Sequence, residues 1–386
     1  MKKRFLRDIA EIQTGPFGSQ LHKEDYVDVG TPIVTVEHLG SRVFSEQNLP
    51  MVSDADKSRL SKYVLKKGDI VFSRVGSVDR CSFVDQKHDG WMFSGRCLRV
   101  RPSEEVEPLF LYYFFCLNAT KEFVRSIAVG ATMPSINTKL LGEVEVVCPG
   151  IEEQRKIADI LSKIDDKIEE NQKINENLQQ QAQALFTQCY EQADVSVPFT
   201  DLIQVLGGGT PKTGEASYWN GEIPFFTPKD VGTPYTLTTE KTITQSGLEH
   251  CNSRLYPVNT VFVTARGTVG KVGLAGVPMA MNQSCYALTG KSISPLLTYH
   301  YILMTVAHLK HKASGAVFDA IITRDFETET VKKLSDTLAE QFVAVASPIY
   351  ECILNNTLES QRLADLRNAL LPKLMSGELD ASDIEL

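Results

Sequence analysis

Two short stretches of the chain place basic side chains around a glycine in the same order. Residues 67–80 read KGDIVFSRVGSVDR, and residues 258–271 read VNTVFVTARGTVGK. In both, an apolar run precedes an Arg, a Gly, a Ser or Thr and a Val, and a basic residue closes the stretch. Arg and Lys donate hydrogen bonds to phosphate oxygens and to acceptor atoms on bases. Glycine allows the backbone to turn tightly beside them.

The candidate contact residues are basic, hydroxyl and amide side chains in these stretches and beside two Gly-rich turns, TGPFGS and LGGGTPKTG. In the first half of the chain they are Gln13, Ser19, Arg74, Ser77, Arg80 and Arg96. In the second half they are Thr210, Lys212, Lys229, Arg266, Thr268, Lys271 and Gln283. The alternative for each one is an ordinary solvated surface residue. We expect Gly76 and Gly267 to form turns rather than contacts.

No pattern typical of catalysis accompanies these residues. LGGGTPKTG lacks the Gly-Lys-[Ser/Thr] of a phosphate-binding loop, and ARGTVGKV has Ala265 and Val272 where that loop needs Gly and Ser or Thr. No Asn-Pro-Pro-aromatic stretch or glycine-rich cofactor fingerprint is present, so the chain is not itself a methyltransferase. The 8 cysteines form no C-x-x-C pair, which favours reduced thiols in a cytoplasmic protein. We expect no catalytic residue, metal or cofactor in this chain.

The two basic stretches belong to a repeat of the whole chain. PLFLYYFFCL from Pro108 matches PLLTYHYILM from Pro295, and Glu153-Gln154 matches Glu340-Gln341. Residues 32–39, 70–75, 223–231 and 261–266 are predicted strands, and 110–117 and 297–304 are predicted short buried helices. The sequence therefore predicts an α+β fold with two similar mixed α/β domains, each followed by a long helix.

The long helices are predicted from two segments with heptad patterns. The first segment gives a seam of Ile157, Leu161, Ile164, Ile168, Asn171, Asn175, Leu178, Ala182, Leu185 and Cys189. The second gives Val345, Ile349, Cys352, Asn356, Glu359, Leu363, Leu366 and Leu370. We place Pro348 in the first turns of its helix or at a kink. The predicted division is a first domain at 1–150, a spacer helix at 151–196, a second domain at 197–337 and a spacer helix at 338–386.

Polar residues interrupt both seams near their middles. Antiparallel pairing of the helices brings Asn171 and Asn175 against Asn356, where buried asparagine fixes the register. The predicted architecture is a pseudo-two-fold repeat with a rigid antiparallel coiled coil between the domains. In the alternative, each helix covers its own domain.

The net charge of −8 is unevenly distributed. Residues 1–101 carry 17 Lys and Arg against 13 Asp and Glu, whereas segments 152–196 and 338–386 each carry an excess of 5 acidic residues. A basic DNA-binding face on the domains is therefore compatible with an acidic chain.

The order of these features, repeated twice, resembles the specificity subunit of type I restriction-modification systems. The resemblance covers nearly the whole chain and rests on the openings FLRDI and FTDLI, the Gly-rich turns, the hairpins in which an Arg precedes Gly-[Ser/Thr]-Val, and the Glu-Gln helix starts. It implies two target recognition domains that each bind one half of a bipartite, asymmetric double-stranded DNA site. It also implies spacer helices (conserved regions 1 and 2) that set the gap and dock two methyltransferase (modification) subunits.

The resemblance further implies partners that supply the chemistry. Restriction/motor subunits join the complex, and S-adenosylmethionine, ATP and Mg belong to the partner subunits rather than to this chain. The alternative is a non-catalytic coiled-coil scaffold that joins two protein-binding globules, which would show no salt-dependent DNA binding.

Overall fold

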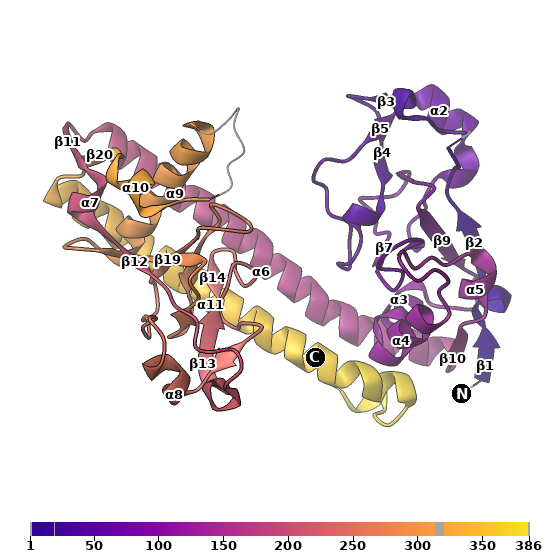
Figure 1. Ribbon diagram of the computed structural model, residues 1–386. Helices are drawn as coiled ribbons and strands as arrows, with labels where there is room; N and C mark the ends of the chain where they lie inside the picture. The colour runs from indigo at the N-terminus through magenta and orange to yellow at the C-terminus, as the bar shows by residue number, and fades with distance from the viewer. Residues whose placement is uncertain (1, 19, 313–319, 385–386) are drawn as a thin grey trace. The chain divides into compact units, whose positions relative to one another are not determined.

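The protein is described by a computed structural model that covers residues 2–18, 20–312 and 320–384. The chain divides into two compact units, the first made of residues up to 167 together with those from 363, and the second of residues 168–362. Two long helices, α6 (Ile151–Glu191) and α11 (Asp336–Ser376), each contribute residues to both units (Figure 1).

The strands of the first unit are β1 (Lys2–Phe5), β2 (Ala10–Thr14), β3 (Tyr26–Val27), β4 (Thr31–Val34), β5 (Met51–Val52), β6 (Ile70–Ser73), β7 (Cys81–Phe83), β8 (Met92–Phe93), β9 (Cys97–Pro102) and β10 (Glu145–Cys148). Its short helices are α1 (Leu6–Ile9), α2 (Asp54–Arg59), α3 (Pro108–Cys116), α4 (Asn118–Ser126) and α5 (Thr138–Gly142). One sheet has the order β2-β9-β6-β7, a second has the order β3-β5-β4-β8, and β1 pairs with β10.

The strands of the second unit are β11 (Val195–Pro198), β12 (Ile203–Gly207), β13 (Trp219–Phe226), β14 (Tyr235–Thr236), β15 (Thr242–Ile243), β16 (Val261–Thr264), β17 (Val272–Ala275), β18 (Ala280–Met281), β19 (Cys285–Gly290) and β20 (Thr330–Lys333). Its short helices are α7 (Phe199–Leu202), α8 (Gln245–Glu249), α9 (Pro295–Lys312) and α10 (Thr323–Glu327). The sheets have the orders β12-β19-β16-β17-β14 and β15-β13-β18, and β11 pairs with β20.

The strand orders confirm the predicted repeat and the α+β class. The order β2-β9-β6-β7 of the first unit recurs as β12-β19-β16-β17 in the second, and the pair β1-β10 recurs as β11-β20. The parallel pair β4-β8 likewise recurs as β13-β18. The second unit differs by β14, which extends its larger sheet by pairing parallel to β17.

Each larger sheet packs against a short apolar helix. The predicted helix at 110–117 is α3, which begins at Pro108, where the missing backbone N–H of proline costs no helical hydrogen bond. It buries Phe110, Phe114 and their neighbours in the core of the first unit. The predicted helix at 297–304 lies within the longer α9, which fills the same place in the second unit.

The strand predicted at residues 32–39 is shorter in the structure. β4 ends at Val34, and residues Val36–His38 form a 3-10 turn instead. The turn is closed by the His38 ring, whose Nδ1 accepts a hydrogen bond from the backbone N–H of Thr35 at 3.0 Å. Side-chain capping of this kind competes with strand pairing and is not visible in an alternating pattern.

The two long helices pair antiparallel, and the seam predicted for α6 is largely buried. Ile157 and Leu161 lie in the core of the first unit, together with Leu371 and Leu374 of α11. In the second unit, the buried residues of α6 and α11 join one core. They are Ala182, Phe186, Cys189, Phe342, Ala346, Tyr350 and Ile353. The helix ends are therefore part of the domain cores as well as of a helical pair.

The seam predicted for α11 is wrong in phase. Val345 is 49% exposed and Leu366 is 44% exposed, and Cys352 also lies at the surface. The buried stripe instead follows Phe342 and Tyr350, because α11 faces both α6 and the aromatic residues of α9. A heptad rule assumes one partner helix, which explains the error. Pro348 lies in the fourth turn of α11, so of the two placements that the sequence left open the first turns are wrong.

A polar layer joins the midpoints of the two helices within the second unit. Asn356 donates through Nδ2 to Oδ1 of Asn175 at 2.9 Å. Asn171 donates to Oγ of Ser360 at 3.3 Å and to Oε2 of Glu359 at 2.7 Å. The structure thus brings together the three asparagines that the sequence singled out.

A buried polar triad ties both long helices to α3 in the first unit. Tyr113 of α3 donates its hydroxyl to Oδ2 of Asp165 on α6 at 2.7 Å. Arg367 of α11 forms an ion pair with the other oxygen of the same carboxylate. Burial, together with the Asp165 carboxylate, raises the pKa of Tyr113, so its hydroxyl stays a donor.

The second unit repeats this triad with other residue types. His300 of α9 occupies the place of Tyr113, and its ring contacts Oε1 of Gln183 on α6 at 3.0 Å. Its Nε2 lies 3.0 Å from the Tyr350 hydroxyl of α11. Burial lowers the pKa of His300 to about 3, so the ring is neutral. Each unit thus connects its core helix to both long helices by hydrogen bonds, once with a charged pair and once with neutral groups.

Candidate nucleic-acid interface

The two basic stretches form equivalent hairpin loops. β6 pairs with β7 and β16 with β17, which leaves residues 74–80 and 265–271 as the loops. Ser73 donates its backbone N–H to Arg80 at 2.9 Å, and Thr264 donates to Lys271 at 3.0 Å, so both loops close in the same way. Glycine is required inside each loop because φ is +75° at Gly76 and +83° at Gly267.

Each hairpin loop is held against two other segments. The backbone N–H of Arg74 bonds to Arg96 at 2.8 Å, and that of Ala265 bonds to Ser284 at the same distance. Residues 94–96 and 282–284 are the loops that lead into β9 and β19. These bonds make Ala265, rather than Arg266, the backbone equivalent of Arg74. The two arginines that the sequence paired are therefore one position apart.

The Gly-rich turns complete the arrangement in both units. A Cβ on Gly15 would lie 2.1 Å from the carbonyl oxygen of Ser94, and one on Gly208 would lie 2.1 Å from that of Asn282. Only glycine allows this approach between backbones. We call residues 15–18, 74–80 and 94–96 the first loop cluster, and residues 207–210, 265–271 and 282–284 the second loop cluster.

The structure separates the predicted basic residues of the first unit into bonded and available groups. Arg74 donates to the carbonyl of Gly95 at 3.0 Å and lies 5.4 Å from the centre of the Phe17 ring. The Arg80 guanidinium donates to the carbonyl of Leu39. Within the described part of the chain, the exposed Arg96 side chain has no hydrogen-bond or ion-pair partner. Arg96 is therefore the arginine of this cluster that is available to a ligand.

The second unit brings its predicted residues together in pairs. The hydroxyl of Thr210 donates to the Gln283 side chain across the cluster. Thr268 donates to the carbonyl of Pro228 at 3.2 Å, next to Lys229, which lies 3.4 Å from Glu240. Three further cations, which are Lys212, Arg266 and Lys271, are exposed and have no side-chain partner among the described residues.

Other predicted residues are not joined to these contacts. Gln13 lies in β2 opposite Arg99, and Ser77 is exposed in the hairpin loop. Neither side chain bonds to another predicted residue within the described ranges. Ser19 lies outside the described residues.

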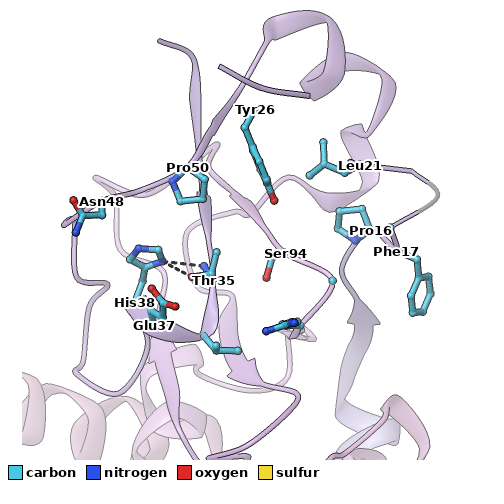
Figure 2. A pocket seen from close by; sticks show the side chains of 14 residues that line it. Pro16, Phe17, Leu21, Tyr26, Thr35, Glu37, His38, Asn48, Pro50 and Ser94 are labelled. Atoms are coloured by element: carbon cyan, nitrogen blue, oxygen red, sulfur yellow. Dashed lines mark hydrogen bonds between the residues drawn. The ribbon is translucent and has the colours of Figure 1, made fainter. Parts of the chain in front are cut away.

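A cavity of about 570 Å³ opens at the first loop cluster. Figure 2 shows Pro16 and Phe17 on one side of it and Glu37, His38 and Asn48 on the other, with Tyr26 between them. Burial raises the pKa of Tyr26, so its hydroxyl remains protonated. Glu37 falls inside the strand predicted at residues 32–39, so the sequence did not indicate this side of the cavity. The signal present in the sequence is Phe17, an aromatic residue in a Gly-Pro-Phe-Gly turn, which is exposed in the structure.

The described residues also bear on the presence of metal sites, membrane-spanning helices and disulfides. No group of three or more His, Cys, Asp or Glu residues suited to a metal ion occurs among the described residues. None of the described helices is long and apolar enough to cross a membrane. All 8 cysteines are free thiols.

A family model decides the class of the protein. The model of the type I restriction modification DNA specificity domain matches residues 1–180 and 195–332. The chain belongs to this family. It is a DNA specificity subunit of a type I restriction-modification system, the non-catalytic component that recognises DNA.

Individual relatives resemble this specificity subunit over most of their length. The HindI specificity subunit of Haemophilus influenzae is 25% identical, with 83% of this chain and 88% of the relative covered. The MjaIX specificity subunit of Methanocaldococcus jannaschii is 23% identical, with 98% and 93% covered. The crystal structure of the specificity subunit from M. genitalium shares the fold with a TM-score of 0.59 at 14% identity, covering 97% of this chain and 95% of that one.

Proposed function

We propose that each unit of this specificity subunit binds one half of a bipartite, asymmetric site in double-stranded DNA. The observation that supports this most strongly is the duplicated loop cluster, which has the same backbone contacts in both units but different side chains. Two surfaces with the same backbone arrangement but different side chains can contact two half-sites of different base sequence. The corresponding division is a first recognition domain at 1–150 and a second at 197–337.

Within each domain we assign the contacts to the predicted residues of its loop cluster. The side chains of Arg96, Lys212, Arg266 and Lys271 are exposed and have no hydrogen-bond or ion-pair partner among the described residues, so they are the first candidates for phosphate or base contacts. Arg74 and Arg80 instead support the loops through their bonds to backbone carbonyls.

We further propose that α6 and α11 set the gap between the half-sites and dock two methyltransferase subunits. Support comes from the asparagine layer, which can fix the register of an antiparallel pair. The repeat of the chain offers each of two identical partners an equivalent surface. Restriction/motor subunits complete the complex, and S-adenosylmethionine, ATP and Mg act in the partners. Because the DNA that such a complex reads is inside the cell, we place the chain in the cytoplasm.

The test is sequencing of methylated adenines in the host genome with and without this gene. An asymmetric two-part motif should be present with the gene and absent after its deletion. An unchanged set of methylated sites in the deletion strain would contradict the proposed function.

A further inference from the structure

Glu37 places an unpaired carboxylate at a surface that we propose binds DNA. The residue is exposed, lies within the 3-10 turn after β4, and lines the cavity of the first loop cluster together with Arg96. Among the described residues, its carboxylate has no hydrogen-bond or ion-pair partner. An acidic side chain in this position needs an explanation, because DNA phosphates repel it.

The turn that carries Glu37 is held in one conformation. The His38 ring is buried, and it accepts from the Thr35 N–H through Nδ1 and lies 3.1 Å from the carbonyl of Gln47 through Nε2. Because Nδ1 is the acceptor, Nε2 carries the proton and donates to Gln47. The Arg80 guanidinium of the hairpin loop bonds to Leu39, directly after the turn. The carboxylate is therefore presented from a rigid support rather than from a freely moving loop.

The surroundings of Glu37 are those of a surface that meets DNA. The cavity is bordered by the Gly-rich turn and by Arg96. Arg74 contacts the Phe17 ring of that turn and donates to the carbonyl of Gly95, which precedes Arg96. These cations attract the phosphate backbone. A carboxylate beside them weakens binding to every sequence unless it accepts a hydrogen bond from a base, so its presence favours sequence selection over affinity.

The major groove offers one base edge that fits a carboxylate without a competing acceptor. Cytosine exposes its N4 amino group as a donor, whereas guanine exposes only the acceptors N7 and O6. Adenine has a donor at N6 but an acceptor at N7 beside it, which repels a carboxylate that approaches closely. Thymine exposes an acceptor and a methyl group.

We propose that Glu37 is a specificity-determining residue that accepts a hydrogen bond from the N4 amino group of a cytosine in the half-site read by the first domain. This inference rests on the proposed function, since it requires that the first loop cluster faces DNA. It assigns to the cavity a ligand class, the major-groove edge of a cytosine, that no similarity to a relative supplies.

The test uses a strain in which the gene is deleted and complemented with wild type, Glu37→Gln or Glu37→Asp, and methylated adenines are sequenced in each. With wild type, the first half of the motif should contain a fixed cytosine. With Glu37→Gln, that one position should relax, and the ratio of methylation at cytosine sites to that at other bases should fall about tenfold or more. Glu37→Asp, which keeps the carboxylate, should retain a preference for cytosine.

The matched control is Glu104→Gln. Glu104 is also exposed and unbonded among the described residues, but it follows Pro102, at the opposite end of β9 from the loop cluster. This change removes the same charge from the same unit and should leave every position of the motif unchanged.

The outcomes separate the two proposals. No motif with wild type would contradict the proposed function itself. A wild-type motif that Glu37→Gln leaves intact, or a relaxed position that is not a cytosine, would overturn the role of Glu37 alone. Loss of all methylation in both Glu37 variants, with Glu104→Gln active, would also overturn it, because a residue that selects one base is not needed for assembly.

Discussion

Two arginines of similar sequence context, Arg74 and Arg266, have different surroundings at the two loop clusters. The Arg74 guanidinium donates to the carbonyl of Gly95 and lies near the Phe17 ring, whereas the Arg266 side chain is exposed and has no partner among the described residues. A surface arginine with no internal partner is free to bind phosphate. Loss of an arginine that supports a loop would instead affect DNA binding indirectly, through the shape of that loop.

We predict that Arg266→Ala weakens DNA binding by the assembled complex to a similar extent on all sequences. Loss of one phosphate contact should lower the slope of log affinity against log salt by about one unit. The measurement is equilibrium binding over a salt series. Lys291→Ala is the control, because Lys291 is exposed directly after β19, at the end away from the second loop cluster. If Arg266→Ala instead relaxed a single base position with an unchanged slope, Arg266 would be a base contact.

A second prediction concerns His300 and pH. Burial lowers the pKa of His300 to about 3, so the unfolded chain binds more protons than the folded chain between that pH and the ordinary value near 6.5. The contribution of the buried neutral His300 ring to the free energy of unfolding is therefore fully present above pH 6.5, and it is lost as the pH falls toward 3. The free energy of unfolding of wild type should fall by up to about 1.4 kcal/mol per pH unit more steeply than that of His300→Gln. Equal slopes in urea denaturation between pH 4 and 6 would contradict this.

At the level of single residues, the sequence predicted which side chains lie in exposed loops better than which of them lie close together. Local order placed Arg96, Arg266 and Lys271 in loops, as in the structure, whereas a DNA contact at any of them stays a prediction. Glu37 and Tyr26, which line the cavity, were not among the sequence candidates because their positions depend on how distant segments pack, which a single sequence does not display.

Helices and strands were predicted correctly from the sequence where a local residue pattern determines them. The strands around Ile70 and Val261 and the buried helix after Pro108 were predicted correctly, since alternation and apolar composition are local signals. The buried face of α11 was not, because it packs against two partners whose positions come from the tertiary fold. The polar triads have no local signal either, as each joins three helices far apart in the chain.

The triads carry a prediction about stability. Arg367→Met leaves the buried Asp165 carboxylate without its cation, which should lower the free energy of unfolding by about 3 kcal/mol. The double variant Asp165→Leu with Arg367→Met should recover much of this loss. Gln183→Leu, at the equivalent place in the neutral triad, should cost only about 1 kcal/mol. Urea denaturation measures all three, and equal costs for Arg367→Met and Gln183→Leu would show that the buried charge is unimportant.

On the scale of the whole molecule, both long helices are uninterrupted for 41 residues and carry the asparagine layer at their midpoints. An ideal helix of that length extends about 60 Å. If the helices set the gap between half-sites, their length must be matched to it.

We predict that removing residues 171–177 together with residues 354–360 shortens the gap. Seven residues keep the heptad phase and shorten each helix by about 10 Å. The methylation motif should then keep both half-sites across a gap shorter by up to about three base pairs, at roughly 3.4 Å each. Activity should be reduced, because such a change also turns one half-site by about a third of a helical repeat. Removal of four residues from each helix, which breaks the phase, is the control and should abolish methylation, whereas an unchanged gap at full occupancy would show that the helices do not set the spacing.

The return of α11 to the first unit has a consequence for how the protein is made. Leu371, Leu374 and Met375 complete the core that Leu6 and Ile9 begin. Domains usually fold in order as they leave the ribosome, at roughly 5–20 residues per second. Here the nascent first domain must wait, with part of its apolar core uncovered, for about 200 residues of later synthesis, because Leu161 and Leu371 belong to the same core. During that period the second domain is synthesised. Its α9 and β16 are the repeat equivalents of α3 and β6, so they could pack against the unfinished core of the first domain in place of the correct elements. We therefore expect divergence between the two repeats to protect the growing chain from pairing the wrong halves.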